Sequence, residues 1–232
     1  MTALALPRLV LCDLDGTLAD SIPDLAYASQ CMARDLNLPI PTLEHIRCWV
    51  GNGMERLVKR VLTREMQAEP DVQLLQQAIA LFQQHYTLCN GEHSVTYKGV
   101  NEGLEWLAAQ GVELACVTNK PEAFTLPLLE ALALEKYFTL IVGGDTLSNK
   151  KPDPQPLLHC MTHFAKKPSE TVMLGDSKND VQAARAAKIP VVCVSYGYNH
   201  GESIALSQPD VIIDSMTELA TIFNQNQHYT MA

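Results

Sequence analysis

The chain has 232 residues, with 17 Lys and Arg against 26 Asp and Glu and a formal net charge of −9. This length suits one large domain or a core with a modest insertion. The acidic balance, with no run of Lys or Arg, argues against a nucleic-acid partner. No apolar run approaches the roughly 20 residues that span a bilayer, so we expect no membrane partner.

Cysteine usage and the N-terminus bear on the cellular compartment. The opening MTALALPRLV has a short apolar run but no basic region ahead of it, so we do not expect a signal peptide. The seven cysteines are scattered and form no CxxC pair. Cys12, Cys116 and Cys193 lie in apolar runs and are expected to be small buried hydrophobes. A cytoplasmic protein, monomeric or homodimeric, is the simplest interpretation.

The first predicted strand, residues 9–12, runs directly into Asp13 and Asp15. Two carboxylates at the end of a buried strand repel each other and are costly to desolvate. A metal ion, a surface turn or a reaction must compensate for that cost.

Residues 18–93 show apolar residues at helical spacing and little strand pattern, and we expect them to form a small all-helical unit. Ser21 is a candidate N-cap for the first helix, and Thr42 and Asp71 open two others. The apolar spacing predicts four helices, at 21–36, from 42, at 54–66 and from 71.

From about residue 100 the pattern changes to short runs rich in β-branched residues, which alternate with predicted helices. Strands are expected at 112–119, 140–144, 171–176, 190–197 and 210–214. Helices are expected at 101–110, 121–133, 154–165 and 183–188. This alternation predicts a parallel sheet covered on both faces. The expected fold is therefore α/β, with a doubly wound Rossmann-like core of residues 1–17 and 94–232 and a helical insertion at 18–93. The polar tail from residue 224 is expected to fray.

In a doubly wound sheet, functional sites form at the carboxyl ends of the strands. These ends carry candidate acidic, hydroxyl, amide and lysine side chains: Asp13, Asp15, Thr118, Asn119, Lys151, Asp176 and Asp180. Carboxylates suit a hard ion such as Mg²⁺, with Asp13 and Asp176 as the natural ligands. Hydroxyl, amide and ammonium groups suit phosphate oxygens. A cation site beside an anion site is what phosphoryl transfer needs, and beside a metal and a lysine Asp13 would stay ionised and able to attack phosphorus.

Four motifs appear in order at the predicted strand ends: DLDGT (13–17), VTN (117–119), KPDP (151–154) and GDSKND (175–180). Together they resemble the motifs of the haloacid dehalogenase-like hydrolases, over nearly the whole chain. The resemblance implies that Asp13 attacks phosphorus and forms an aspartyl-phosphate. It also implies that Asp15 protonates the leaving alcohol and then activates water, a role that favours phosphorus chemistry over dehalogenation.

The same resemblance implies the ligand set. Mg²⁺ would be held by Asp13, the backbone carbonyl of Asp15 and Asp176, with Asp180 in support. Thr118 and Lys151 would bind the transferring phosphoryl group. The substrate would be a small-molecule phosphate ester.

The helical insertion resembles the small cap of that family, which would hinge near residues 17–19 and 97–99 and close over the site. Its segment WVGNGMER (49–56) resembles the cap's specificity loop, in which Gly51, Asn52 and Gly53 approach the substrate closely. Arg56 would then meet a substrate carboxylate, with Arg47 as a competitor. SYGYNHG (195–201), VGNG (50–53) and KPDPQPL (151–157) resemble the phosphoglycolate phosphatase subfamily, which implies 2-phosphoglycolate as substrate.

Alternatives remain open at several of these positions. Thr118 and Asn119 are also good helix caps, Asp180 suits the first turn of a helix, and Arg56 could lie on a solvated helix face. Lys151 is preferred to Lys150 because proline follows it in the family pattern. For the whole protein the alternatives are a phosphosugar mutase, a phosphatase of another small metabolite, and a non-catalytic phospholigand-binding scaffold.

Overall fold

The computed structural model describes residues 4–224, so the tail that we expect to fray lies almost entirely outside the described residues. Six parallel strands form one sheet in the order β5-β4-β1-β6-β7-β8. Their bounds are β1 Leu9–Cys12, β4 Glu113–Val117, β5 Leu140–Val142, β6 Thr171–Gly175, β7 Val191–Val194 and β8 Val211–Ile213. The predicted α/β, doubly wound core is thereby confirmed.

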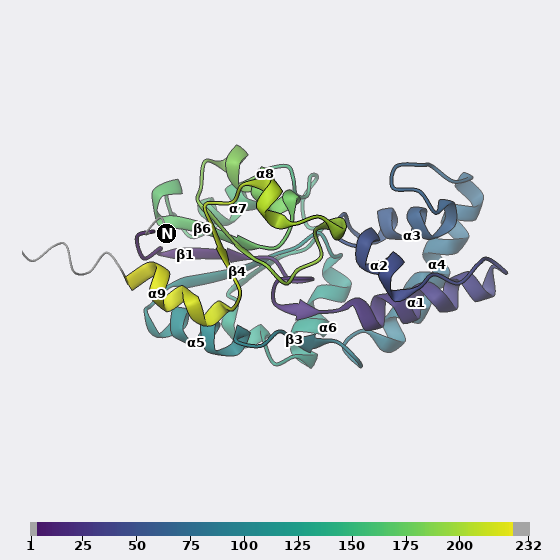
Figure 1. Ribbon diagram of the computed structural model, residues 1–232, viewed down its shortest axis with the longest axis horizontal. Coiled ribbons are helices and arrows are strands. Elements are labelled where there is room, and N and C mark those ends of the chain that lie inside the picture. The colour runs from purple at the N-terminus through teal and green to yellow at the C-terminus, as the bar shows by residue number, and fades with distance from the viewer. Residues whose placement is uncertain (1–3, 225–232) are drawn as a thin grey trace, which may run out of the picture.

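Helices cover both faces of the sheet (Figure 1). One face carries α5 (Val100–Ala109), α6 (Glu122–Ala131) and α9 (Leu219–Asn224), and the other carries α7 (Gln155–His163) and α8 (Lys178–Ala187). Along β1, Val10 and Cys12 pack toward the first face, whereas Leu9 and Leu11 pack toward the second. Burial on both faces explains why this strand is apolar without alternation.

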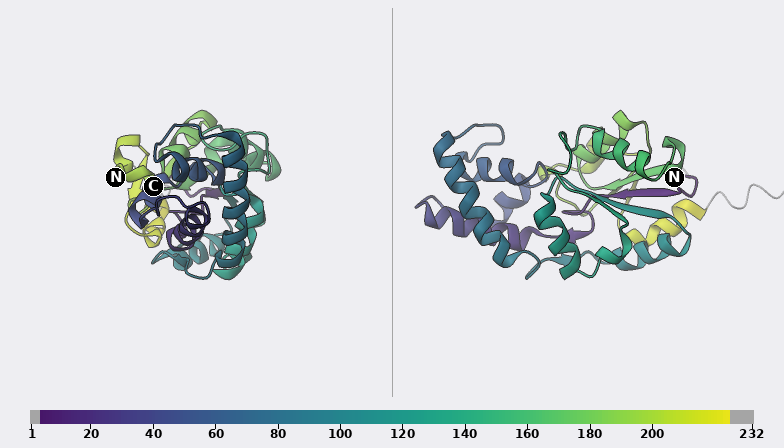
Figure 2. Two further views of the ribbon diagram at one scale, coloured as in Figure 1. Left: turned by 90° about the vertical axis from the view of Figure 1, so that its right-hand side faces the viewer. Right: turned by 180° about the vertical axis from the view of Figure 1, so that it is seen from behind.

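Four further helices pack against one another beyond the carboxyl ends of the strands, as Figures 1 and 2 show. They are α1 (Ile22–Asp35), α2 (Leu43–Trp49), α3 (Met54–Thr63) and α4 (Val72–Cys89). Their shared core includes Met32, Ile46, Val58 and Phe82, all at most 1% exposed. No described helix is both long enough and apolar enough to cross a bilayer.

The helix caps are partly as predicted. Thr42 and Asp71 cap α2 and α4 by accepting backbone N–H groups of their first turns. Ser21 lies at the N-cap position of α1, as predicted, but its hydroxyl makes no cap bond and instead donates to Asp15 Oδ1 at 2.5 Å. An acid in the turn after β1 therefore replaces the helix backbone as its partner.

A short antiparallel ribbon joins the helical unit to the sheet. It consists of β2 (Ala19–Asp20) and β3 (Val95–Thr96), which the sequence does not indicate. The fully buried carboxylate of Asp24 in α1 fixes the returning chain, because it accepts the N–H groups of Gly91, His93 and Ser94 and the Ser94 hydroxyl. The ribbon lies beside the expected hinges, and the domain limits at 18 and 93 stay a prediction.

The remaining elements are short turns of 3₁₀ helix. They are η1 Glu135–Tyr137, η2 Pro168–Glu170, η3 Asn199–Gly201, η4 Ile204–Ser207 and η5 Met216–Glu218. The strand β7 ends at Val194, earlier than expected, because residues 195–201 leave the sheet and turn toward the carboxyl ends of β1 and β6.

Candidate active site

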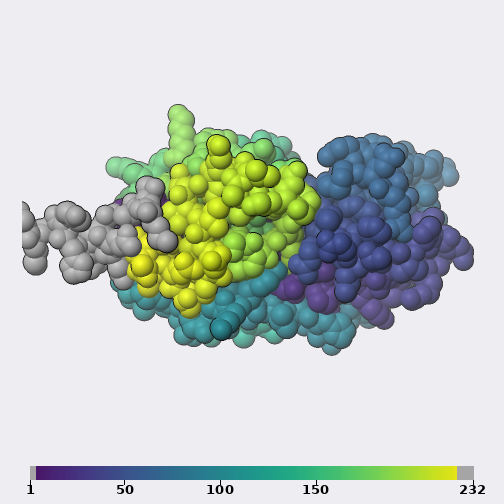
Figure 3. Space-filling model, in the orientation of Figure 1, coloured from purple at the N-terminus to yellow at the C-terminus, as the bar shows by residue number. Residues whose placement is uncertain are grey.

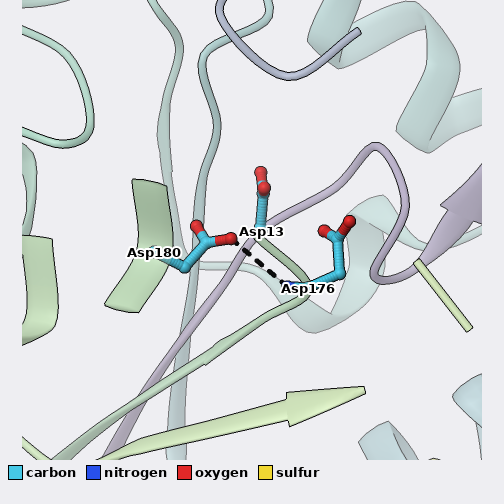
Figure 4. Close-up of side chains that lie close together, drawn as sticks. All are labelled: Asp13, Asp176 and Asp180. Atoms are coloured by element: carbon cyan, nitrogen blue, oxygen red, sulfur yellow. Dashed lines mark hydrogen bonds between the residues drawn. The ribbon is translucent and has the colours of Figure 1, made fainter. Parts of the chain in front are cut away.

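Three carboxylates come together where β1 and β6 end. Asp13 directly follows β1, Asp176 directly follows β6, and Asp180 lies in the first turn of α8 (Figure 4). One oxygen from each lies within 4.8 Å of the others, and all three side chains are buried. Lys151, in the loop after β5, places Nζ 3.0 Å from Asp13 Oδ1 and 2.7 Å from Asp180 Oδ1.

The charges of this cluster do not balance. Three carboxylates face one contacting ammonium, which leaves an excess of two negative charges when all are ionised. Burial raises the pKa of Asp13 to about 7, although Lys151 opposes the shift. Burial, with the neighbouring Asp180 and Asp13 carboxylates, also holds the pKa of Asp176 well above its usual range. Hard oxygen donors with two uncompensated charges fit a divalent cation such as Mg²⁺.

Asp180 is the most fully bonded of the three acids. Its Oδ1 accepts from Lys151, and its Oδ2 accepts the N–H groups of Asp176 and Ser177 and the Ser177 hydroxyl. It therefore orients both the Asp176 turn and Lys151, in addition to contributing charge.

The space for Asp176 is set by two glycines. Its Oδ1 accepts the Thr17 hydroxyl and its Oδ2 accepts the Tyr198 N–H, both at 2.8 Å. A Cβ added to Gly16 would lie 2.5 Å from Asp176 Oδ2, and one added to Gly197 would lie 2.1 Å from Asp176 Cβ. Neither position has room for a side chain, so both glycines are needed for this carboxylate to stand where it does.

Asp15 points to a different set of partners. Its Oδ1 accepts from the Ser21 hydroxyl and, at 3.0 Å, from Lys120 Nζ, which also lies 3.3 Å from Oδ2. Lys120 in turn donates to the hydroxyl of Tyr86 in α4 at 2.6 Å. Sequence reasoning assigned no role to Lys120. The available signal was its place directly after Asn119, at the carboxyl end of β4.

The two predicted phosphate-binding residues after β4 are placed differently. Thr118 is buried, and it lines a cavity together with Asp13 and Asp15. The Asn119 amide donates to the carbonyls of Gly51, at 3.1 Å, and Lys151, at 2.9 Å. Both Asn119 amide hydrogens are thus used in hydrogen bonds that position the loop of residues 51–53 and the loop that contains Lys151.

The cap loop of residues 51–53 lies directly against the core. The Gly51 carbonyl accepts a second amide, that of Asn179, at 3.0 Å. A Cβ on Gly53, where φ is +87°, would lie 3.0 Å from the Asn119 carbonyl oxygen. Asn52 is held by Arg60, which donates to its Oδ1 at 2.8 Å. The glycines allow this close approach to the core, and their predicted approach to the substrate stays a prediction.

A cavity of about 40 Å³ opens onto Asp13 and Asp15 between the cap and the core. Apolar and aromatic side chains line its other side: Leu25, Met54, Leu57, Phe82 and Tyr86 from the cap and Phe124 from α6. Among the described residues that line it, Lys120 is the single cation. On the face drawn in Figure 3, the surface of the helical unit meets that of the core directly.

The two arginines considered as substrate-binding residues lie elsewhere. Arg56 lines a second, basic cavity of about 410 Å³ with Lys59, Lys150 and other cations, and its Nη1 lies 3.0 Å from Glu69 Oε1. The guanidinium of Arg47 lies over the Tyr198 ring, 5.5 Å from its centre. Neither arginine lines the cavity at Asp13.

Comparison with known proteins agrees with this geometry. Residues 10–194 match the model of the family described as haloacid dehalogenase-like hydrolase. With more than half of the chain matched, the protein belongs to the haloacid dehalogenase-like hydrolases, as the four motifs predict.

Within that family, the chain is similar to proteins named phosphoglycolate phosphatase. One, from Nitrosococcus oceani, is 48% identical over 94% of this chain and 97% of its own. Another, from Thiobacillus denitrificans, is 50% identical over 95% of this chain and 97% of its own. A crystal structure described as a predicted phosphoglycolate phosphatase from Haemophilus somnus 129PT has a TM-score of 0.89 at 35% identity, covering 94% of this chain and 98% of that one. The predicted subfamily resemblance is confirmed.

Proposed function

We propose that the protein is a Mg²⁺-dependent phosphatase that hydrolyses 2-phosphoglycolate to glycolate and phosphate through an aspartyl-phosphate on Asp13. The buried cluster of three carboxylates and Lys151, beside a small cavity, carries the proposal. The relatives named phosphoglycolate phosphatase, at about half identity, support the substrate. Seven free cysteines support a reducing, cytoplasmic setting.

The contacts of Asp13 fix one of its carboxylate oxygens and leave the other available for attack. Its Oδ1 accepts the Leu14 N–H at 2.7 Å and lies 3.0 Å from Lys151 Nζ. Its Oδ2 makes no hydrogen bond among the described residues and is therefore the attacking atom. The Oδ2–phosphorus bond forms as the bond from phosphorus to the glycolate oxygen breaks. Mg²⁺, when bound, neutralises charge on the carboxylates and the phosphoryl oxygens.

Lys151 and Thr118 act on the phosphoryl group. Lys151 is 2% exposed, so its charge is poorly screened by water and acts strongly on a nearby phosphoryl oxygen. The Thr118 hydroxyl accepts the Lys120 N–H at 3.2 Å and keeps its own hydrogen for a phosphoryl oxygen. Both groups would hold the phosphoryl through transfer and hydrolysis.

Asp15 would move the protons. In its protonated form it gives a proton to the departing glycolate oxygen. It then takes a proton from the attacking water. The attack of this water on phosphorus breaks the Oδ2–phosphorus bond and releases phosphate. Ser21 and Lys120 fix this carboxyl at the edge of the cavity, so the exchange occurs at a defined place.

A phosphate-release assay tests the proposal. The substrates are 2-phosphoglycolate, ethyl phosphate and β-glucose 1-phosphate, each with Mg²⁺ and with EDTA. We expect the highest kcat/KM for 2-phosphoglycolate and no turnover in EDTA. Isomerisation of the sugar phosphate without phosphate release would indicate a mutase. A scaffold would release phosphate from none of the three.

A further inference from the structure

The substrate proposed above has two anionic ends, and the site must bind both. The phosphoryl end belongs beside Asp13, Thr118 and Lys151. In 2-phosphoglycolate only one methylene group separates the leaving oxygen from the carboxylate. A group that binds this carboxylate must therefore lie next to the acid that protonates the leaving oxygen, which is Asp15.

Lys120 is the cation in that position. Its Nζ lies 3.0 Å from Asp15 Oδ1, and its side chain is 3% exposed. It is the single cation among the described residues that line the cavity at Asp13. Arg56 faces the other cavity and is paired with Glu69. A substrate carboxylate next to Asp15 would therefore not contact Arg56.

Tyr86 supplies a second donor beside Lys120. Its hydroxyl accepts from Lys120 Nζ at 2.6 Å, so its own hydrogen points elsewhere, and no described residue accepts it. Tyr86 is 1% exposed, and its ring packs against those of Phe82 and Phe124, with centroids 5.4 Å and 5.0 Å away. Packing fixes the hydroxyl, and the apolar wall strengthens any charged hydrogen bond made there.

We propose that Lys120 Nζ and the Tyr86 hydroxyl together bind the substrate carboxylate and select carboxylate-bearing phosphate esters. The proposal rests on the proposed function. It assigns to a core lysine and a tyrosine of α4 the role that the sequence suggests for Arg56. Because Tyr86 belongs to the cap and Lys120 to the core, a bound carboxylate would also join the two.

The test compares 2-phosphoglycolate with ethyl phosphate, which keeps the phosphate and the chain length but lacks the carboxylate. The measured quantity is the ratio of their kcat/KM values. We expect Lys120→Met to lower this ratio on the order of 100-fold, because a buried charge pair is lost. Tyr86→Phe keeps the ring and should lower it roughly tenfold. Lys59→Met, which removes a cation from the second cavity, should leave it unchanged.

Two results would overturn the assignment. One is an equal fall in kcat/KM for both substrates in Lys120→Met and Tyr86→Phe. That result would mean that these residues only position Asp15 or stabilise the fold. The other is a fall in the ratio for Arg56→Met with none for Lys120→Met. If Lys120→Met does not fold, Tyr86→Phe decides alone. A wild-type protein that does not prefer 2-phosphoglycolate to ethyl phosphate would refute the proposed function instead, before any variant is compared.

Discussion

Replacing Asp13 by Asn should stabilise the metal-free protein while abolishing its activity. In the folded protein the pKa of Asp13 is raised to about 7 from an ordinary 3.8 by burial. Between these values the folded state keeps a proton that the unfolded state has released, so the free energy of unfolding falls as pH rises. The slope is about 1.4 kcal/mol per pH unit for one proton.

The stabilisation from the protonated acid is fully present below pH 3.8 and is lost as pH rises through 7. Integrated from about pH 5 to pH 8, linkage gives a loss of roughly 2.5 kcal/mol from Asp13 in the wild type. Asn does not titrate, so Asp13→Asn should gain that amount on the wild type over this interval. The Asp13 carboxylate also helps to raise the pKa of Asp176, so its removal acts on Asp176 in the same direction.

The assay is urea unfolding of both proteins in EDTA at pH 5 and pH 8. Asp214→Asn, the same chemical change at an exposed site, is the control and should show no such gain. Saturating Mg²⁺ at pH 8 should stabilise the wild type much more than Asp13→Asn. If the difference between Asp13→Asn and the wild type does not change from pH 5 to pH 8, burial does not raise the pKa of Asp13 and the reasoning is refuted.

Three other substitutions test the parts around the cluster. Asn179→Ala removes one of two amides that bind the Gly51 carbonyl, and we expect a roughly tenfold lower kcat/KM with unchanged urea stability. Gly197→Ala places a Cβ 2.1 Å from Asp176 Cβ, so turnover should fall and half-maximal activation should need more Mg²⁺ in a metal titration. Asp24→Ala leaves four donors without their acceptor, two of them on buried Ser94, and should lower the free energy of unfolding by roughly 3 kcal/mol in urea, with Asp24→Asn recovering part of it.

The sheet and the acidic cluster could be predicted from the sequence because their signals are local and repeated. Each buried strand is a short apolar run, and parallel strands bring their carboxyl ends to one edge. Asp13 and Asp176 directly follow such runs, so their meeting follows from the fold class alone. The caps at Thr42 and Asp71 depend only on the next few residues and were predictable for the same reason.

The features that the sequence did not reveal depend on partners outside the helix or strand in which each residue lies. Ser21 has the residue type and position of a helix cap, yet its partner is Asp15, 6 residues earlier and outside the helix that a cap pattern describes. Lys120 meets Asp15, 105 residues away, and Tyr86, 34 residues away. Helical spacing places Arg56 on α3 but does not say which of two cavities it faces. The two-residue strands of the ribbon are too short to carry a periodic signal.

The central claim, that Asp13 is the nucleophile, is tested most directly by acid-quenching the protein during turnover of 2-phosphoglycolate with Mg²⁺ and mapping its peptides by mass spectrometry. The account predicts one hydroxylamine-labile phosphoryl group on the peptide that contains Asp13, and none in Asp13→Asn. A phosphoryl group on any other residue, or the same modification in Asp13→Asn, would contradict it.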